Sequence, residues 1–204
     1  MCRSARTQEA AVVSMRRLAL LISSLPAWQA FLLTCIPFFG AGYLATPTPG
    51  QLESVVETET MFNRMMLTMM PIAIVIYSWI WSIGNVANRA ASNGVKRPVR
   101  LFNFALPYAF VYMVFAYFFF PRPNNTDNPL VPIGLVMVLH ATAVACTFYA
   151  VASAAIRLKS FETGSRVGFG RAFGTFFLIW FFPLGVWLVQ PRANRARAEI
   201  AARD

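Results

Sequence analysis

Acidic residues and histidine are scarce in this chain of 204 residues. It contains eight Asp and Glu residues and one His, and every carboxylate lies outside the five longest apolar stretches. Proton relays and cation-coupled transporters usually place an ionisable group at membrane depth. Intramembrane metalloproteases need a histidine pair, or a histidine with carboxylates, to hold their metal. The sequence therefore argues against an enzyme and predicts no catalytic residue, no cofactor and no metal centre.

Cysteines are also few. Cys35 and Cys146 lie inside apolar stretches, where a free thiol usually behaves as a small hydrophobic side chain. Cys2 is terminal, and no lipobox or myristoylation signal accompanies it. Three cysteines without short-range pairing show neither a disulfide framework nor a zinc site.

Charged side chains make up only 13% of the chain, whereas hydrophobic ones make up 57%. A soluble domain of this size needs about twice that charged fraction to cover its surface. The formal charge of +10 does not indicate nucleic-acid binding, because the Lys and Arg residues form short clusters between apolar stretches rather than one stripe. Composition thus predicts a membrane-embedded chain whose partner is the lipid bilayer and not a nucleic acid.

Five apolar stretches approach the length of about 20 residues that a helix needs to cross a bilayer. They are 27–45, 66–84, 101–120, 130–156 and 172–190. The predicted fold is an all-α integral membrane helical bundle with four full transmembrane helices and a fifth apolar segment. We expect a single membrane domain over 1–204, with an interfacial N-terminal segment (1–26), a bundle (27–190) and a basic tail (191–204).

The fifth stretch is interrupted in its middle by Phe182-Pro-Leu-Gly185. Pro183 removes one helical hydrogen bond, and Gly185 permits the backbone angles of a reversal. We expect a bend at Pro183–Gly185 and a segment that re-enters the membrane or lies along its interface. A kinked but complete fifth helix is the alternative.

Basic residues alternate along the predicted loops. Loops 85–100 and 157–171 are rich in them, and loops 46–64 and 121–129 are poor. The positive-inside rule then predicts a cytoplasmic N-terminus, with both basic loops on the same side. A basic rim in contact with anionic lipid headgroups is expected there, formed by Arg89, Lys96, Arg97, Arg100, Arg157, Lys159 and Arg171.

Two segments are similar to the two ends of a widespread family of small bacterial membrane proteins. They are Leu25-Pro-Ala-Trp-Gln-Ala-Phe-Leu-Leu33 and the run from Phe176 to Asn194, whose pattern is W-F-F-P-x-G-x-W-x-x-Q-P-R-x-N. Together they cover about thirty residues. The resemblance implies a multi-pass protein of the bacterial inner membrane, and it implies no activity.

His140 lies near the middle of the fourth stretch. A polar group at that depth is costly, so it can serve to bind a ligand or to titrate. The favoured interpretation is a neutral imidazole that is hydrogen-bonded to the backbone, a Tyr or a Thr of a neighbouring helix.

Methionines are concentrated in one ten-residue segment. Their four-residue spacing stacks them on helix faces, and thioethers are soft ligands that suit Cu(I). Methionine is also an ordinary filler of irregular helix contacts, and no Cys or His cluster is at hand to deliver a metal. Packing is therefore favoured over ligand binding for Met61, Met65, Met66, Met69 and Met70.

Small residues are frequent in the fourth stretch and at the start of the fifth. They allow membrane helices to approach closely, so the fourth stretch is expected to be the central helix of the bundle. Its predicted contact positions are Ala141, Ala145 and Ala152, and Gly170 and Gly174 are a candidate docking face.

These features favour a non-catalytic inner-membrane bundle that acts as an accessory, scaffold or immunity-type subunit, with a membrane-protein partner or a second copy of itself. The alternative is a small transporter or channel for a soft metal or an uncharged solute. A channel needs polar residues at helical spacing along two or more spans, and the apolar stretches carry only scattered Thr, Tyr and Asn.

Overall fold

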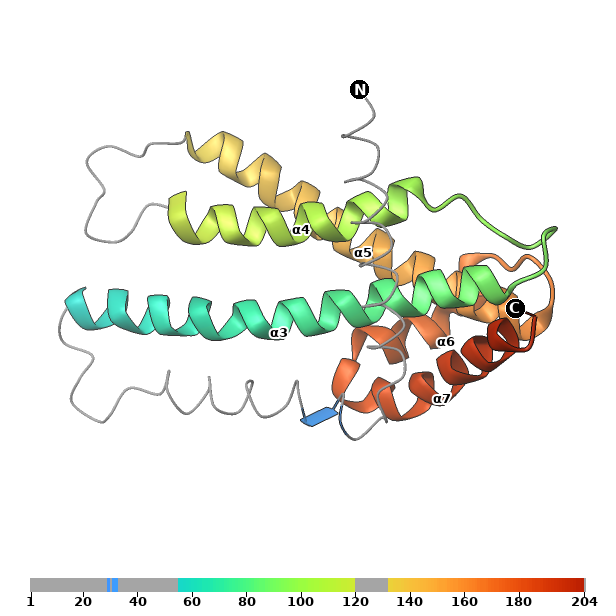
Figure 1. Cartoon of the computed structure of the whole chain (residues 1–204). Helices are drawn as coiled ribbons and strands as arrows, with labels where there is room; N and C mark the ends of the chain where they lie inside the picture. Colours follow the sequence, from blue (N-terminus) through green and yellow to red (C-terminus); the bar gives the residue numbers. More distant parts are fainter. Residues whose placement is uncertain (1–28, 30, 33–54, 120–131, 204) are drawn as a thin grey trace, which may run out of the picture. The chain divides into compact units, whose positions relative to one another are not determined.

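A computed structural model describes residues 29, 31–32, 55–119 and 132–203 (Figure 1). The helices are α3 (Val55–Ala90), α4 (Arg100–Phe119), α5 (Ile133–Thr163), α6 (Phe169–Trp180) and α7 (Phe182–Ala201). No strand occurs within these ranges. The predicted all-α class is confirmed for the described chain.

Two helices are long and apolar enough to cross a membrane, over Met69–Ala90 of α3 and Gly134–Thr163 of α5. The pair α6 and α7 passes the same test only when taken together, and it is bent by 120°. The part of α4 whose side chains the structure describes, Arg100–Ala116, is apolar but shorter. Most of the predicted first span at 27–45 lies outside the described residues. The described chain therefore has two candidate spans, or three if the bent pair is one span, and the predicted four full spans are not confirmed.

The helices extend past the apolar stretches that predicted them. α3 continues to Ala90 and α5 to Thr163, so Arg89, Arg157 and Lys159 are helical rather than in loops. Helical hydrogen bonds join backbone groups and can continue into polar sequence, so the end of an apolar stretch does not mark the end of a helix. α5 ends only where Gly164 adopts a positive φ of 62°, the left-handed conformation common after the last turn of a helix.

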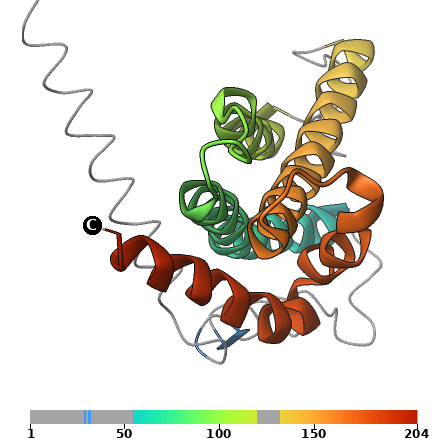
Figure 2. The same ribbon diagram turned by 90° about the vertical axis from the view of Figure 1, so that its right-hand side faces the viewer.

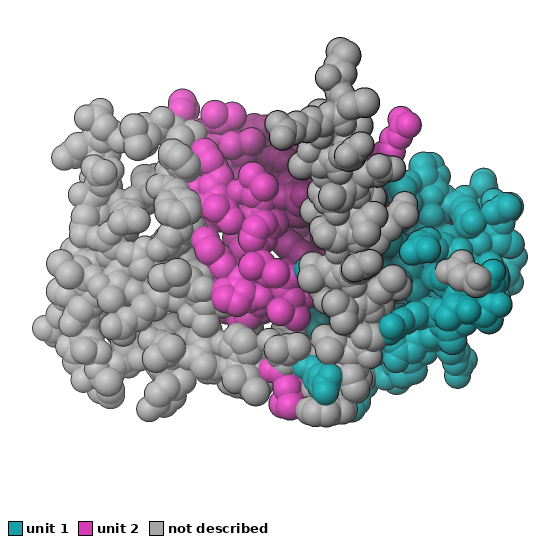
Figure 3. All heavy atoms as spheres, viewed as in Figure 1, with its two compact units in different colours: residues 1–30, 78–99, 151–204 teal, residues 31–77, 100–150 magenta. Residues whose placement is uncertain are grey.

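The chain divides into two compact units, shown in different colours in Figure 3. Among the described residues, unit 1 takes in 29, 78–99 and 151–203, and unit 2 takes in 31–32, 55–77, 100–119 and 132–150. Both α3 and α5 contribute one part to each unit.

The core of unit 1 is built on the C-terminal half of α3. Trp79, Ile80 and Ile83 are at most 2% exposed. The indole of Trp79 meets the ring of Phe182 edge-on at a centroid distance of 4.7 Å, an arrangement that aromatic pairs favour. A smaller cluster of Val86, Ala90 and Ala196 is covered by Phe161 and Ile200.

The core of unit 2 is smaller and joins α4 to α5. One cluster consists of the buried Tyr112, Ala116 and Ala143, with Tyr108 and Leu139 packed against them. Phe102, Ala105 and Leu106 of α4 are also buried.

The helices α6 and α7 run in different directions (Figure 2). The bend between them lies at Phe181, two residues before the predicted position. Pro183 occupies the first turn of α7, where its missing N–H costs nothing. Gly185 does not have a positive φ. A Cβ at Gly185 would overlap the backbone carbonyl of Leu178, so this glycine permits the close approach of the two helices rather than an unusual backbone angle. The segment bends as predicted. The predicted position of the bend and the predicted role of Gly185 are wrong.

Candidate functional site

Arginine side chains link the two short loops of unit 1, at 91–99 and at 164–168. Arg97 Nη2 donates to the carbonyl oxygen of Val167 at 2.7 Å, and Arg157 Nη2 donates to that of Pro98 at 2.7 Å. Arg166 Nη2 donates in the opposite direction, to the carbonyl oxygen of Lys96 at 3.3 Å. We call these three guanidinium–carbonyl contacts the arginine junction.

Asn88, near the end of α3, fixes the backbone of the first loop at the arginine junction. Its Nδ2 donates to the carbonyl oxygen of Arg97 at 3.1 Å, and its Oδ1 accepts from the backbone N–H of Arg97 at 2.8 Å. On the second loop, the backbone N–H of Val167 donates to Ser160 Oγ at 3.3 Å. Side chains from α3 and α5 therefore hold both loops to the helices that precede them.

Arg157 does not lie on the predicted basic rim. It is 3% exposed, and its Nη2 donates to the backbone carbonyl oxygen of Pro98. The reason is its place on α5, because the helix continues past 156 and carries Arg157 onto the buried face. This part of the rim prediction is wrong.

The other predicted rim residues remain accessible to different degrees. Arg97 is half-buried in the arginine junction, and Lys159 lies 3.2 Å from Glu162. Arg89, Lys96 and Arg171 are exposed on unit 1, and Arg100 is exposed on unit 2. Their contact with anionic headgroups stays a prediction.

A buried polar contact joins α3 to α7 within unit 1. Trp79 Nε1 donates to Gln190 Oε1 at 2.7 Å, and Gln190 is only 1% exposed. The amide Nε2 of Gln190 lies 3.5 Å from Asn194 Oδ1. A buried indole N–H normally finds a partner, and here the partner comes from the tail of the chain.

His140 contacts Tyr112 within unit 2. The imidazole Nδ1 lies 3.1 Å from the Tyr112 hydroxyl, and the two rings are 5.6 Å apart. Tyr112 belongs to α4, so this is the tyrosine partner that the favoured interpretation of His140 proposes. A second polar pair in this unit joins Tyr77 Oη to Thr147 Oγ1 at 3.5 Å.

The methionine segment lies on α3. Met69 and Met70 are partly buried, and the side chains of Met61, Met65 and Met66 lie outside those that the structure describes. Groups of three or more His, Cys, Asp and Glu residues are absent from the described part of the chain.

The buried small residues of α5 are not the predicted ones. Ala141 and Ala145 are exposed, and Ala152 is half-buried. The buried positions are Ala143, Ala150, Ala154 and Ala155. The predicted contact positions are wrong, because α5 is apolar on all sides and hydropathy alone does not indicate which side is packed. The apolar stretch of α5 that could cross a membrane is also less buried than that of α3, at 22% against 39%.

One side of α6 is open. Its buried side consists of Ala172, Thr175, Phe176 and Ile179. A Cβ on Gly170 or Gly174 would meet no atom within 4 Å. The open side also carries large aromatic residues that are 41–54% exposed, namely Phe169, Phe173, Phe177, Trp180 and Phe181.

Successive aromatic rings of α6 touch along the helix. The Phe173 and Phe177 rings meet edge-on at 4.7 Å, and those of Phe177 and Phe181 are stacked at 5.9 Å. At 100° per residue, the exposed aromatics and the two glycines span an arc of roughly 140°. We call this surface the open face of α6.

Sequence reasoning missed the polar contacts of Trp79, Asn88 and Gln190. Gln190 stands in the tail pattern that carries the family resemblance, as do Phe182 and Gly185, and all three make close contacts within unit 1. The pattern was therefore the one available signal for these positions. Comparison with protein-family models, with curated proteins and with solved structures finds no match for this chain.

Proposed function

We propose that the protein is a multi-pass helical protein of the bacterial inner membrane and acts, without catalysis, as an accessory or scaffold subunit that binds a helix of a partner membrane protein. The two apolar candidate spans and the bent pair are compatible with a membrane location. The assignment to the bacterial inner membrane rests on the resemblance of the segments 25–33 and 176–194.

The observation that carries the scaffold proposal is the open face of α6. Apolar side chains at a membrane surface are satisfied by lipid as well as by protein, so exposure alone does not favour a partner. Gly170 and Gly174 add a reason, because two glycines about one turn apart leave a strip of the helix surface without side chains, and another backbone can approach closely there. Phe173 and Phe177 flank this strip and offer rings against which a second helix can pack.

Affinity purification from membranes in mild detergent tests the proposal. The wild-type chain is expected to retain a membrane protein in stoichiometric amount, and Gly174→Leu is expected to lose it. The same substitution is expected to leave the melting temperature of the chain unchanged, because the added side chain enters open space. Ala141→Leu is the matched control, since it enlarges an exposed small residue on another helix.

Retention of the partner by Gly174→Leu at the level of Ala141→Leu would show that this face is not the docking surface. A wild-type chain that purifies alone and moves solute across liposome membranes would instead support a transporter or channel.

A further inference from the structure

Unit 1 has a second surface feature, a cavity of about 540 Å³ between the end of α5 and the middle of α7. Phe161 and Glu162 of α5 line one wall. The other wall is one side of α7, formed by Trp187, Leu188, Pro191, Arg192 and Arg195.

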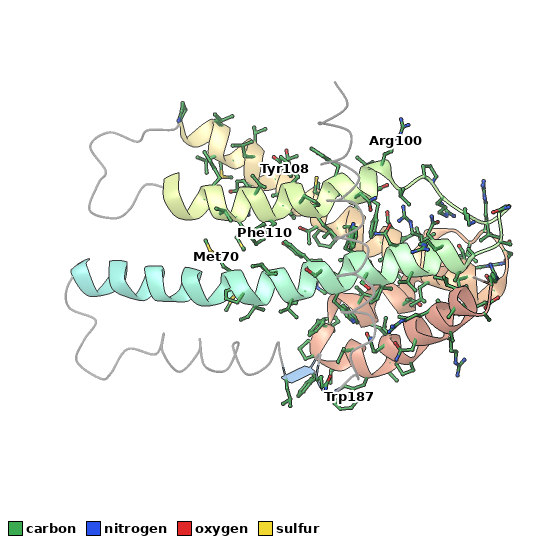
Figure 4. All side chains as sticks on the ribbon, in the orientation of Figure 1. Met70, Arg100, Tyr108, Phe110 and Trp187 are labelled. Carbon is green, nitrogen blue, oxygen red and sulfur yellow. The ribbon has the colours of Figure 1, made fainter. Side chains whose placement is uncertain are left out.

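The α7 wall changes from apolar to basic along the helix. Leu184 is 74% exposed, and Trp187 and Leu188 are 48% and 54% exposed. Trp187 points away from the body of the helix pair (Figure 4). Arg192 and Arg195 follow within eight residues of Trp187, which corresponds to about 12 Å of helix. A tryptophan at such a transition is typical of the membrane–water interface.

The basic end of the cavity carries a net positive charge. Glu162 accepts from Lys159 at 3.2 Å and lies 3.6 Å from Arg192 Nη1. Among the lining residues, Arg192 and the exposed Arg195 are cations and Glu162 is the one carboxylate, which leaves a net charge of +1. Lys159, which lies outside the lining, offsets part of the charge of Glu162. An anion at this end gains from the charge that Glu162 does not offset.

We propose that this cavity binds one anionic phospholipid. Its phosphate lies between Arg192 and Arg195, which present guanidinium donors suited to phosphate oxygens. Its glycerol and upper acyl region lie along Trp187 and Leu188. A ligand with an anionic head and an apolar body matches the polarity of this wall, whereas a free phosphate uses only its basic end. The inference rests on the proposed membrane location and is independent of the open face of α6.

The test compares two arginine variants of the full-length chain purified in mild detergent. Arg195→Gln removes a cation from the cavity, and Arg197→Gln removes one from the same helix outside the cavity lining. Native mass spectrometry then measures bound lipid after addition of phosphatidylglycerol or phosphatidylcholine. A surface cation is worth on the order of 1 kcal/mol to an anionic lipid, which corresponds to about fivefold in affinity.

The wild type and Arg197→Gln are expected to retain one phosphatidylglycerol with equal affinity, and Arg195→Gln is expected to bind it about fivefold more weakly. If both variants bind phosphatidylglycerol equally more weakly, the effect is one of general surface charge, and the proposal of a defined site is wrong. Phosphatidylcholine bound as tightly as phosphatidylglycerol would overturn the anionic class. Inorganic phosphate that raises the melting temperature as much as phosphatidylglycerol does would show that the ligand is free phosphate. Loss of a protein partner from Gly174→Leu has no bearing on these outcomes, so the two proposals fail separately.

Discussion

Unit 1 and unit 2 are stabilised in different ways. In unit 1, side chains of Trp79, Arg97 and Arg157 donate to acceptors that are distant in sequence, at 2.7 Å in each case. In unit 2 two long-range side-chain contacts join neutral groups, Tyr112 with His140 at 3.1 Å and Tyr77 with Thr147 at 3.5 Å. Hydrogen bonds from a charged donor are stronger than neutral ones.

Both units nevertheless expose large apolar side chains. Val111, Met137 and Val138 of unit 2 are 62–65% exposed, and Leu184 of unit 1 is 74% exposed. Such surfaces fit the proposed membrane location, because hydrophobicity does not drive helices together in lipid. The comparison indicates that unit 1 specifies its geometry through directional polar contacts, whereas unit 2 relies on the fit of small residues. Four substitutions test this contrast.

The largest effect is expected at the turn between α6 and α7 in unit 1. Gly185→Val places a side chain on the Leu178 carbonyl, and a backbone neighbour cannot move aside as a side chain can. The free energy of unfolding is expected to fall by about 3 kcal/mol, measured as a lower melting temperature in detergent. Gly174→Val is the control, because its side chain enters open space. Equal melting temperatures would mean that the two helices do not approach at Gly185.

Arg157→Met tests the arginine junction. The methionine preserves much of the apolar stem but leaves the Pro98 carbonyl without this donor. The expected loss is about 2 kcal/mol, the range for a hydrogen bond to a charged group, together with faster proteolysis in the 91–99 loop. Arg166→Met, which removes an exposed and longer contact, is expected to cost less. If the two variants behave alike, burial of Arg157 adds nothing to the junction.

Ala143→Leu probes the close packing of unit 2. Ala143 is buried in the cluster with Tyr112 and Ala116, and overpacking it is expected to cost about 1.5 kcal/mol. Ala145→Leu, two residues away and exposed, is expected to change stability by less than about 0.5 kcal/mol. Thermal unfolding in detergent distinguishes the two variants. A larger loss for Ala145→Leu than for Ala143→Leu would mean that the contact position predicted from the sequence was right.

Tyr112→Phe is expected to have the smallest effect. It removes the hydroxyl that contacts His140, and a side-chain hydrogen bond between membrane helices contributes about 0.6 kcal/mol on average. Tyr108→Phe is the control in the same cluster. A loss as large as that of Arg157→Met would contradict the contrast between the units.

Several features followed from the sequence alone. The apolar stretches at 66–84 and 130–156 predicted α3 and α5, because a run of about 20 apolar residues is incompatible with other regular structure in lipid. The Phe182-Pro-Leu-Gly185 interruption predicted that the last stretch bends, and it does so two residues earlier.

The partners of the polar side chains did not follow from the sequence. Every residue has a backbone carbonyl, so no pattern of residue types indicates that Arg157 reaches Pro98 or that Arg97 reaches Val167. The contact of Trp79 with Gln190 joins residues 111 positions apart, and only the return of α7 to α3 brings them together.

The amino-acid sequence by itself determined the helical class of this chain and the approximate position of its apolar helices, because both depend on the length and hydropathy of local segments. The tertiary structure alone decided which side of α5 is packed, where the α6–α7 turn lies and that Arg157 is buried. The physical reason is the same in each case. A helix that is apolar all round has no preferred side until a neighbour covers one, and an arginine has no preferred carbonyl until the fold places one within 3 Å or so of its guanidinium group.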